Sequence, residues 1–214
     1  MNDIVNHLER THRELTGGRI PAGDGRAITL RRTYQADIED VWQACTDPDR
    51  LSRWFLPVTV AAKVGGHYQL EGNAGGEILR CEPPRLLAVT WVFGEDTTDK
   101  DVSEVEVRLT AAGPDETELE LRHTSVVDPD WWAKFGPGAV GVGWDIALLS
   151  LRGYLAGEPR MDEAAWTASA EGTEYITGSG RAWGRAQLAA EGDAAAAELS
   201  ARNTIAFYTG TEQP

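Results

Sequence analysis

The sequence predicts an α+β fold in which a curved antiparallel sheet wraps around one long helix. Between residues 58 and 124, short segments of alternating polar and apolar residues are separated by turns rich in glycine, proline and asparagine. Connections this short join antiparallel neighbours. Over residues 138–155, apolar residues recur at helical spacing, which predicts a long amphipathic helix lying on the sheet. A gap between such a helix and a curved sheet is the default place for a ligand.

The chain is predicted to begin with a helix and then a strand. Apolar residues near helical spacing predict a short amphipathic helix over residues 3–15, which stops before Gly17 and Gly18. The Gly-Asp-Gly sequence at residues 23–25 predicts a turn, and the alternation after it predicts a strand over residues 27–35.

Two short helices are predicted next. Asp37 and Asp47 each stand where a helix N-cap is expected, and Pro48 follows at a favoured first helical position. The second helix is expected to end near Trp54 and Phe55.

Six strands are then predicted, with turn residues between them. They span residues 58–62, 66–71, 77–81, 86–93, 102–110 and 117–124. In the last two, charged residues alternate with apolar ones, so one face of the sheet is expected to be wet and the other covered.

Residues 158–214 predict a helical extension rather than a second globular unit. The segment is rich in alanine, and glycines at 172, 178–180 and 192 are expected to separate three short helices. These helices should dock on the domain itself or on a second copy, in which case a homodimer would form through the extension. The predicted organisation is therefore an N-terminal helix and turn (1–25), a sheet-and-helix domain (26–157) and the extension (158–214).

Charge and hydropathy exclude several classes of partner. The chain has 34 acidic against 20 basic residues and a net charge of -14, and the sequence shows no basic patch, so nucleic acid is not an expected partner. No segment approaches the roughly 20 apolar residues of a membrane span, so no membrane insertion is expected. The polar, acidic start does not resemble a signal peptide, and we expect a cytoplasmic protein.

No metal or cofactor is expected. Cys45 and Cys81 are two isolated thiols, which are more typical of small buried residues than of a disulfide or a metal site. Residues 136–141 match the G-x-G-x-x-G pattern, but a loop, not a strand, is predicted before them, so a dinucleotide site is not expected. These glycines are instead expected to let the long helix start close to the sheet, or to keep the entrance of the pocket open and mobile.

A series of motifs resembles the START-related (SRPBCC) superfamily, which includes the birch-pollen allergen, polyketide cyclases and the activator of the heat-shock chaperone ATPase. The motifs are Ile38-Glu39-Asp40-Val41-Trp42, Thr46-Asp47-Pro48-Asp49-Arg50-Leu51-Ser52-Arg53-Trp54-Phe55, Val64-Gly65-Gly66-His67-Tyr68, Cys81-Glu82-Pro83-Pro84-Arg85-Leu86-Leu87, Thr90-Trp91 and Gly143-Trp144. The likeness covers about residues 26–157, and the chain looks like the branch of chaperone-activator homologues that is found widely in bacteria. It implies a helix-grip fold, but no particular chemistry.

Four aromatic residues are candidates for lining a cavity. In the resembling family, a pair such as Trp54 and Phe55 sits where the small helices meet the cavity mouth, and it would act as a gate or ligand platform, or as a plug closing the core. Trp91 and Trp144 are expected on the inner faces of a strand and of the long helix, where they would line the pocket or pack in the core.

His123 is the most interesting polar residue. The alternation that buries Leu119 and Leu121 turns it toward the same face. There it could hydrogen-bond a ligand carbonyl or act as an acid or base near neutral pH; the alternative is a core histidine with satisfied hydrogen bonds.

The hypothesis that follows is binding of a small hydrophobic or amphipathic molecule between the sheet and the long helix. Trp54, Phe55, Trp91, His123 and Trp144 would line the site. Two alternatives stay open: a polyketide-cyclase-like or hydrolase enzyme that uses His123, and a co-factor that interacts with a chaperone.

Overall fold

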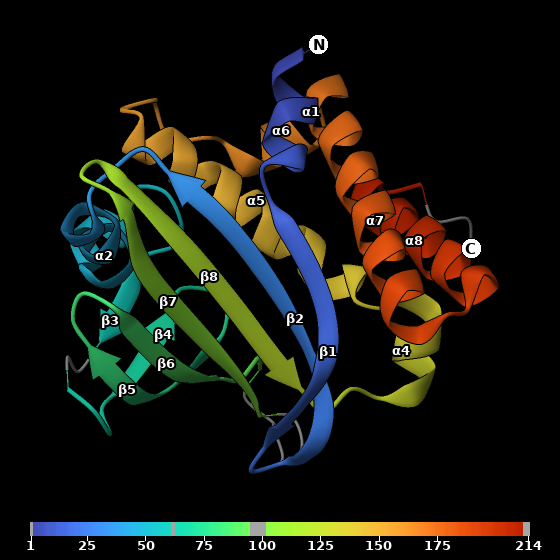
Figure 1. Cartoon of the computed structure of the whole chain (residues 1–214), viewed down its shortest axis with the longest axis horizontal. Helices are drawn as coiled ribbons and strands as arrows, with labels where there is room; N and C mark the ends of the chain where they lie inside the picture. The colour runs from blue at the N-terminus through green and yellow to red at the C-terminus, as the bar shows by residue number, and fades with distance from the viewer. Residues whose placement is uncertain (1, 61–62, 95–101, 212–214) are drawn as a thin grey trace.

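A computed structural model describes residues 2–60, 63–94 and 102–211 of the chain. Eight strands within these residues form one antiparallel sheet in the order β1-β2-β8-β7-β6-β5-β4-β3 (Figure 1). The strands are β1 (His12–Ile20), β2 (Gly23–Tyr34), β3 (Val58–Val60), β4 (His67–Leu70), β5 (Gly75–Glu82), β6 (Leu86–Trp91), β7 (Ser103–Gly113) and β8 (Glu116–Ser125). The helices are α1 (Asn2–Glu9), α2 (Ile38–Thr46), α3 (Pro48–Leu51), α4 (Pro129–Phe135), α5 (Gly138–Leu155), α6 (Glu163–Thr167), α7 (Ala170–Glu191) and α8 (Ala194–Thr209).

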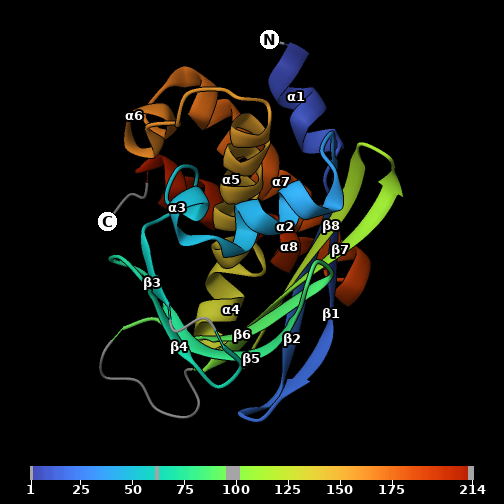
Figure 2. The ribbon, with the colours of Figure 1, turned by 90° about the vertical axis from the view of Figure 1, so that its left-hand side faces the viewer.

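The long helix α5 lies over one face of the curved sheet, which confirms the predicted α+β helix-grip architecture (Figure 2). Its residues Trp144, Ala147, Leu148 and Leu151 are buried. Helix α2 packs against α5 and against β7 and β8, so the two small helices cover one end of the space between α5 and the sheet. No described helix combines the length and apolar character that a membrane crossing requires.

The first strand, β1, corrects the prediction of a helix over residues 3–15. The helix ends at Glu9, and from His12 the chain pairs with β2 along its whole length, with Ile20 opposite Gly23. Residues 23–25, which were predicted to form a turn, are instead the first residues of β2. The turn lies just before them, at Pro21 and Ala22. Pairing with β2 decides the conformation of this segment, because the spacing of its apolar residues taken alone fits a helix as well.

The predicted starts of the two short helices are confirmed, whereas α4 was not predicted. The Asp37 carboxylate accepts a hydrogen bond from the Asp40 amide at 2.7 Å, and Asp47 accepts from the Arg50 amide at 2.9 Å. The same device begins α4: Asp128 accepts from the Trp131 amide at 3.0 Å, so the segment expected to be a loop before the glycines is a capped helix.

The C-terminal extension docks on the protein's own surface. Helix α7 packs against α5, β1 and α1, while α8 packs against α7 and α4 (Figure 1). The predicted division of the chain at residues 25/26 and 157/158 stays a prediction.

Two of the three breaks predicted in the extension are wrong. Only Gly192, with a φ of 76°, ends a helix; Gly172 and residues 178–180 lie inside the continuous helix α7. A methyl group on Gly178 would stand 2.4 Å from Leu8 Cδ1, and one on Gly180 would stand 2.5 Å from Ile205 Cγ1. These glycines therefore serve close packing between segments and do not interrupt the helix.

The glycines at the start of α5 face the extension rather than the sheet, contrary to expectation. A methyl group on Gly138 would lie 2.9 Å from Thr204 Cγ2, and one on Gly141 would lie 2.2 Å from Trp183 Cε2. The missing side chains let α7 and α8 approach α5, so the match to a dinucleotide motif has a packing explanation.

Candidate functional site

An apolar cavity of about 390 Å³ lies between α5, the small helices and the inner face of the sheet. This volume falls in the range of roughly 300–1,000 Å³ that is typical of small-molecule sites. Aliphatic side chains from β3 to β8 and α5 make up much of the wall. Six aromatic residues also line it: Trp42, Trp54, Phe55, Tyr68, Trp91 and Trp144.

One end of the cavity reaches the surface. Pro48, Lys63, Cys81 and Pro83 line it there, and all four are exposed. Lys63 is the only charged residue among the described residues of the lining. A ligand in this cavity would thus be surrounded by apolar groups along most of its length and could present a polar end beside Lys63.

Trp54 and Phe55 form a stacked wall together with Trp144. The ring centroids of Trp54 and Phe55 are 5.4 Å apart, and those of Phe55 and Trp144 are 6.2 Å apart. The Trp54 indole N–H donates to the Ala44 carbonyl at 2.9 Å, and the Ser150 hydroxyl donates to the Trp54 carbonyl at 2.6 Å. These bonds hold Trp54 in one orientation.

Trp91 extends the aromatic wall across the sheet. Its ring centroid lies 5.0 Å from that of Trp144 and 6.4 Å from that of Tyr68. The Tyr68 hydroxyl donates to the Thr90 carbonyl at 2.7 Å, and burial raises the pKa of this phenol. Tyr68 therefore remains a neutral part of the wall.

His123 lies behind Trp91 and Trp144 and is not part of the cavity lining. The Trp144 indole N–H donates to Nδ1 at 3.0 Å. Nε2 is 2.8 Å from the Ser103 hydroxyl oxygen, and that hydroxyl donates to the Trp91 carbonyl at 2.8 Å. Nδ1 must therefore be the acceptor, and Nε2 carries the proton that is donated to Ser103.

Burial lowers the pKa of His123 to about 4. The inward direction of the side chain agrees with the strand alternation, but both ring nitrogens are already engaged. The geometry is that of a satisfied core histidine, and it offers no group for a ligand carbonyl or for acid–base work near neutral pH.

The two cysteines are free thiols, and both line the cavity. Cys45 is half-buried on α2, where burial raises its pKa to about 12, and Cys81 is exposed on β5. Among the residues that the structure describes, no cluster of histidine, cysteine, aspartate or glutamate has the arrangement of a metal site.

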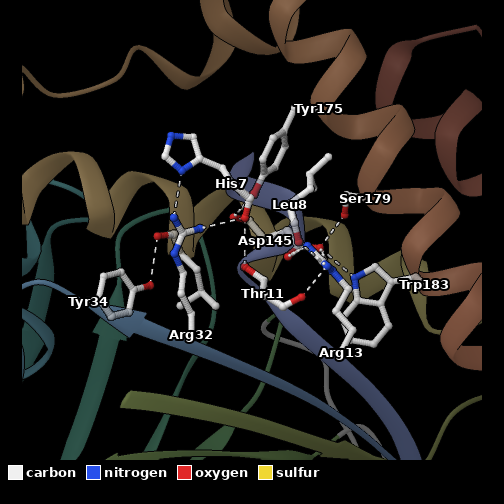
Figure 3. A network of polar contacts seen from close by, with 11 residues as sticks. His7, Leu8, Thr11, Arg13, Arg32, Tyr34, Asp145, Tyr175, Ser179 and Trp183 are labelled. Atoms are coloured by element: carbon white, nitrogen blue, oxygen red, sulfur yellow. Dashed lines mark hydrogen bonds and ion pairs between the residues drawn. The ribbon is translucent and has the colours of Figure 1, made fainter. Parts of the chain in front are cut away.

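A buried ion pair on the opposite side of α5 was missed by sequence reasoning. The carboxylate of Asp145 is completely buried and accepts from Arg13 Nε at 2.9 Å and Nη2 at 2.8 Å. It also accepts from the Ser179 hydroxyl at 2.5 Å and the Trp183 indole at 3.0 Å (Figure 3). The one available signal was that Asp145 is the only charged residue over residues 138–151.

This network holds α5 in place on the side that faces away from the cavity. The Tyr175 hydroxyl donates to the Asp145 carbonyl at 3.0 Å, and the Tyr34 hydroxyl donates to the Leu148 carbonyl at 3.1 Å. Strands β1 and β2 and helix α7 therefore hold the helix whose other face lines the cavity (Figure 3).

The family model described as "Activator of Hsp90 ATPase homolog 1-like protein" matches residues 35–156, more than half of the chain. No match was found among curated proteins.

Solved structures similar to this chain include CalU16 from Micromonospora echinospora. Its crystal structure is 39% identical, with a TM-score of 0.66, and the alignment covers 82% of this chain and 97% of that one. Its solution structure is 38% identical, with a TM-score of 0.69 and coverages of 84% and 96%. Protein MLL2253 from Mesorhizobium loti, at 24% identity, shares the fold with a TM-score of 0.53, over 62% of this chain and 98% of that one.

Proposed function

Since the chain belongs to the family of Activator of Hsp90 ATPase homolog 1-like proteins, within the SRPBCC superfamily, we propose that it reversibly binds a small hydrophobic or amphipathic molecule. The single observation that carries this proposal is the cavity of about 390 Å³ beneath α5, with its aromatic lining. The family model alone supports a ligand-binding fold and leaves the ligand open.

The shape of the walls favours a flat, ring-containing ligand. The pair of Trp54 and Phe55 and the pair of Trp91 and Trp144 offer ring faces and edges, and aromatic pairs contribute about 0.5–1.5 kcal/mol beyond their buried area. Apolar area removed from water adds about 25 cal/mol per Å².

The surface end of the cavity explains why the ligand class includes amphipathic molecules. Lys63 would face an acidic or hydroxyl group at this end, while the apolar part lies deeper. Because an exposed ammonium group contributes little by itself, it would set the orientation of the ligand more than its affinity.

A fluorescence titration of the whole protein tests the proposal. Four of the cavity-lining residues are tryptophans, so a bound fatty acid, flavonoid or aromatic polyketide should change the emission in a saturable way. We expect Trp91→Ala to weaken binding at least tenfold, and Trp131→Ala, which changes an exposed tryptophan outside the cavity, to leave it unchanged.

A response that does not saturate with any of the three classes would speak against the proposal, as would equal affinities of the two variants. Native mass spectrometry of protein purified from its own source provides an independent check, because a molecule held in the cavity should appear as a discrete added mass.

The two alternative functions have less support. An enzyme that relies on His123 would need the imidazole to reach the substrate, and this ring lies behind two tryptophans with both nitrogens bonded. A chaperone partner rests on the description of the family alone. It would be tested by capture of a chaperone on the acidic outer surface and its loss on charge reversal there.

A further inference from the structure

A second hollow, of about 680 Å³, lies between the end of α1, strands β1 and β2, and helix α7. Figure 1 shows β1 running beside α7. Five arginines line this hollow, Arg10, Arg13, Arg31, Arg32 and Arg185, together with two glutamates, Glu9 and Glu118. In the whole chain, acidic residues outnumber basic ones by 34 to 20, whereas in the lining of this hollow arginines outnumber acidic residues. We call this hollow the arginine groove.

Two of the five arginines are neutralised within the protein. Arg13 is paired with the buried carboxylate of Asp145 at 2.8 Å. Arg31 is paired with Glu120 at 2.5 Å and with Glu14 at 3.3 Å. These pairs hold the walls of the groove in place, and they leave their guanidinium groups little charge to offer a ligand.

Arg32 forms the buried part of the groove and has no acidic partner among the residues that the structure describes. It is only 3% exposed, its Nη2 donates to His7 Nδ1 at 3.1 Å, and its guanidinium carbon lies 5.7 Å from the centre of the Tyr34 ring (Figure 3). No carboxylate in the described part of the chain lies within ion-pair distance of it. A buried charge without a counter-charge is costly, so an anion beside Arg32 would be stabilising.

Arg10 and Arg185 stand at the open side of the groove. Both are exposed, and neither guanidinium group makes an ion pair or a hydrogen bond with any residue that the structure describes. One follows α1 and the other lies on α7, so three guanidinium groups without carboxylate partners reach the same groove from three separate elements.

We propose that the arginine groove binds the phosphate group of a small soluble phosphate ester. Guanidinium groups present parallel N–H donors that match the oxygens of phosphate. Glu9 and Glu118 oppose the anion, which predicts weak binding that decreases as salt is added. The groove shares no lining residue with the aromatic cavity. A test of phosphate binding in the groove is therefore independent of the proposed binding of a hydrophobic ligand in the cavity.

An NMR titration of the whole protein with inorganic phosphate, at constant ionic strength adjusted with sodium chloride, tests the site. We expect saturable shifts of the amides of residues 10–13, 31–33 and 182–189. The double variant Arg10→Gln/Arg185→Gln should bind at least tenfold more weakly. Glu118→Gln should bind more tightly, because it removes an opposing charge.

The control is Arg202→Gln on α8, which removes an exposed arginine that does not line the groove and should leave binding unchanged. Thermal unfolding checks that all variants are folded. Phosphate shifts that map elsewhere, an unaffected double variant, or weaker binding by Glu118→Gln would each overturn the proposal. So would binding to vesicles of phosphatidylserine without saturable binding of inorganic phosphate, since that result indicates a lipid surface.

Discussion

Trp144 and Asp145 are adjacent on α5, yet their side chains belong to two different assemblies. The Trp144 indole lines the aromatic cavity and donates to His123 at 3.0 Å. The Asp145 carboxylate is buried against β1 and α7, where Arg13 donates to it at 2.8 and 2.9 Å. Successive residues of a helix point about 100° apart, so one peptide unit connects the cavity wall to the buried ion pair.

Asp145→Asn should destabilise the protein strongly. The change removes the carboxylate and leaves the Arg13 guanidinium, with only 6% of its side chain exposed, without a counter-charge. Breaking a buried pair in this way costs about 3–5 kcal/mol in the free energy of unfolding, measured by urea denaturation. Arg19→Gln breaks an ion pair whose side chains are both 82% exposed, and it should change this free energy by less than about 1 kcal/mol. Equal effects of the two variants would contradict the assigned role of Asp145.

His123 should make stability fall as the pH is lowered. Its pKa is about 4 in the folded protein against about 6.5 in an unfolded chain, so the unfolded state takes up a proton first. The stabilisation is complete above pH 6.5 and is lost as the pH falls from about 6.5 to 4, by roughly 3 kcal/mol in total. Urea unfolding between pH 7 and 4.5 should show a smaller decrease for His123→Gln than for the wild type. His67→Gln, which changes an exposed histidine, should follow the wild type.

Ala147→Leu should abolish ligand binding without unfolding the protein. Ala147 lies on α5 and lines the cavity, so a larger side chain would occupy the space of the ligand and bury apolar surface. We expect affinity to fall more than tenfold in the fluorescence titration while the melting temperature stays level or rises. Ala133→Leu on the exposed side of α4 is the matched control. Unchanged affinity of Ala147→Leu would place the ligand elsewhere.

Gly180→Ala should lower stability although alanine is the better helix former. The new methyl group would stand 2.5 Å from Ile205 Cγ1, and overpacking of this kind costs about 1–3 kcal/mol. Gly153→Ala meets only the flexible end of Glu158, at 3.0 Å, and should be neutral or stabilising by up to about 1 kcal/mol. Thermal melts of both variants check the difference in sign.

The parts of the fold predicted correctly were those with a local signal. Alternation specified the strands between residues 58 and 124, and Asp37 and Asp47 each satisfy amide groups within their own helix. Strand β1 was missed because its conformation depends on pairing with β2, and the wrong break at residues 178–180 arose because the partners of those glycines, Leu8 and Ile205, are distant in sequence. Local patterns carry no information about such contacts.

In the candidate site, too, the features with a local signal in the sequence were predicted, and those that depend on contacts between segments were not. Strand alternation and helical periodicity placed Trp91 and Trp144 on inner faces, and together with Trp54 and Phe55 they line the cavity. His123 was given the right direction but lies outside the lining, because Trp91 and Trp144 lie in front of it. Their roles in binding stay a prediction.

The buried ion pair of α5 also bears on where the folding unit of this protein ends. Asp145 lies inside residues 35–156, whereas Arg13, Ser179 and Trp183, its side-chain donors in the described structure, all lie outside that range. An excised fragment limited to the region matched by the family would retain the carboxylate and lose all three donors. We therefore expect such a fragment to be less stable than the whole protein, because its buried carboxylate would have no side-chain donor left.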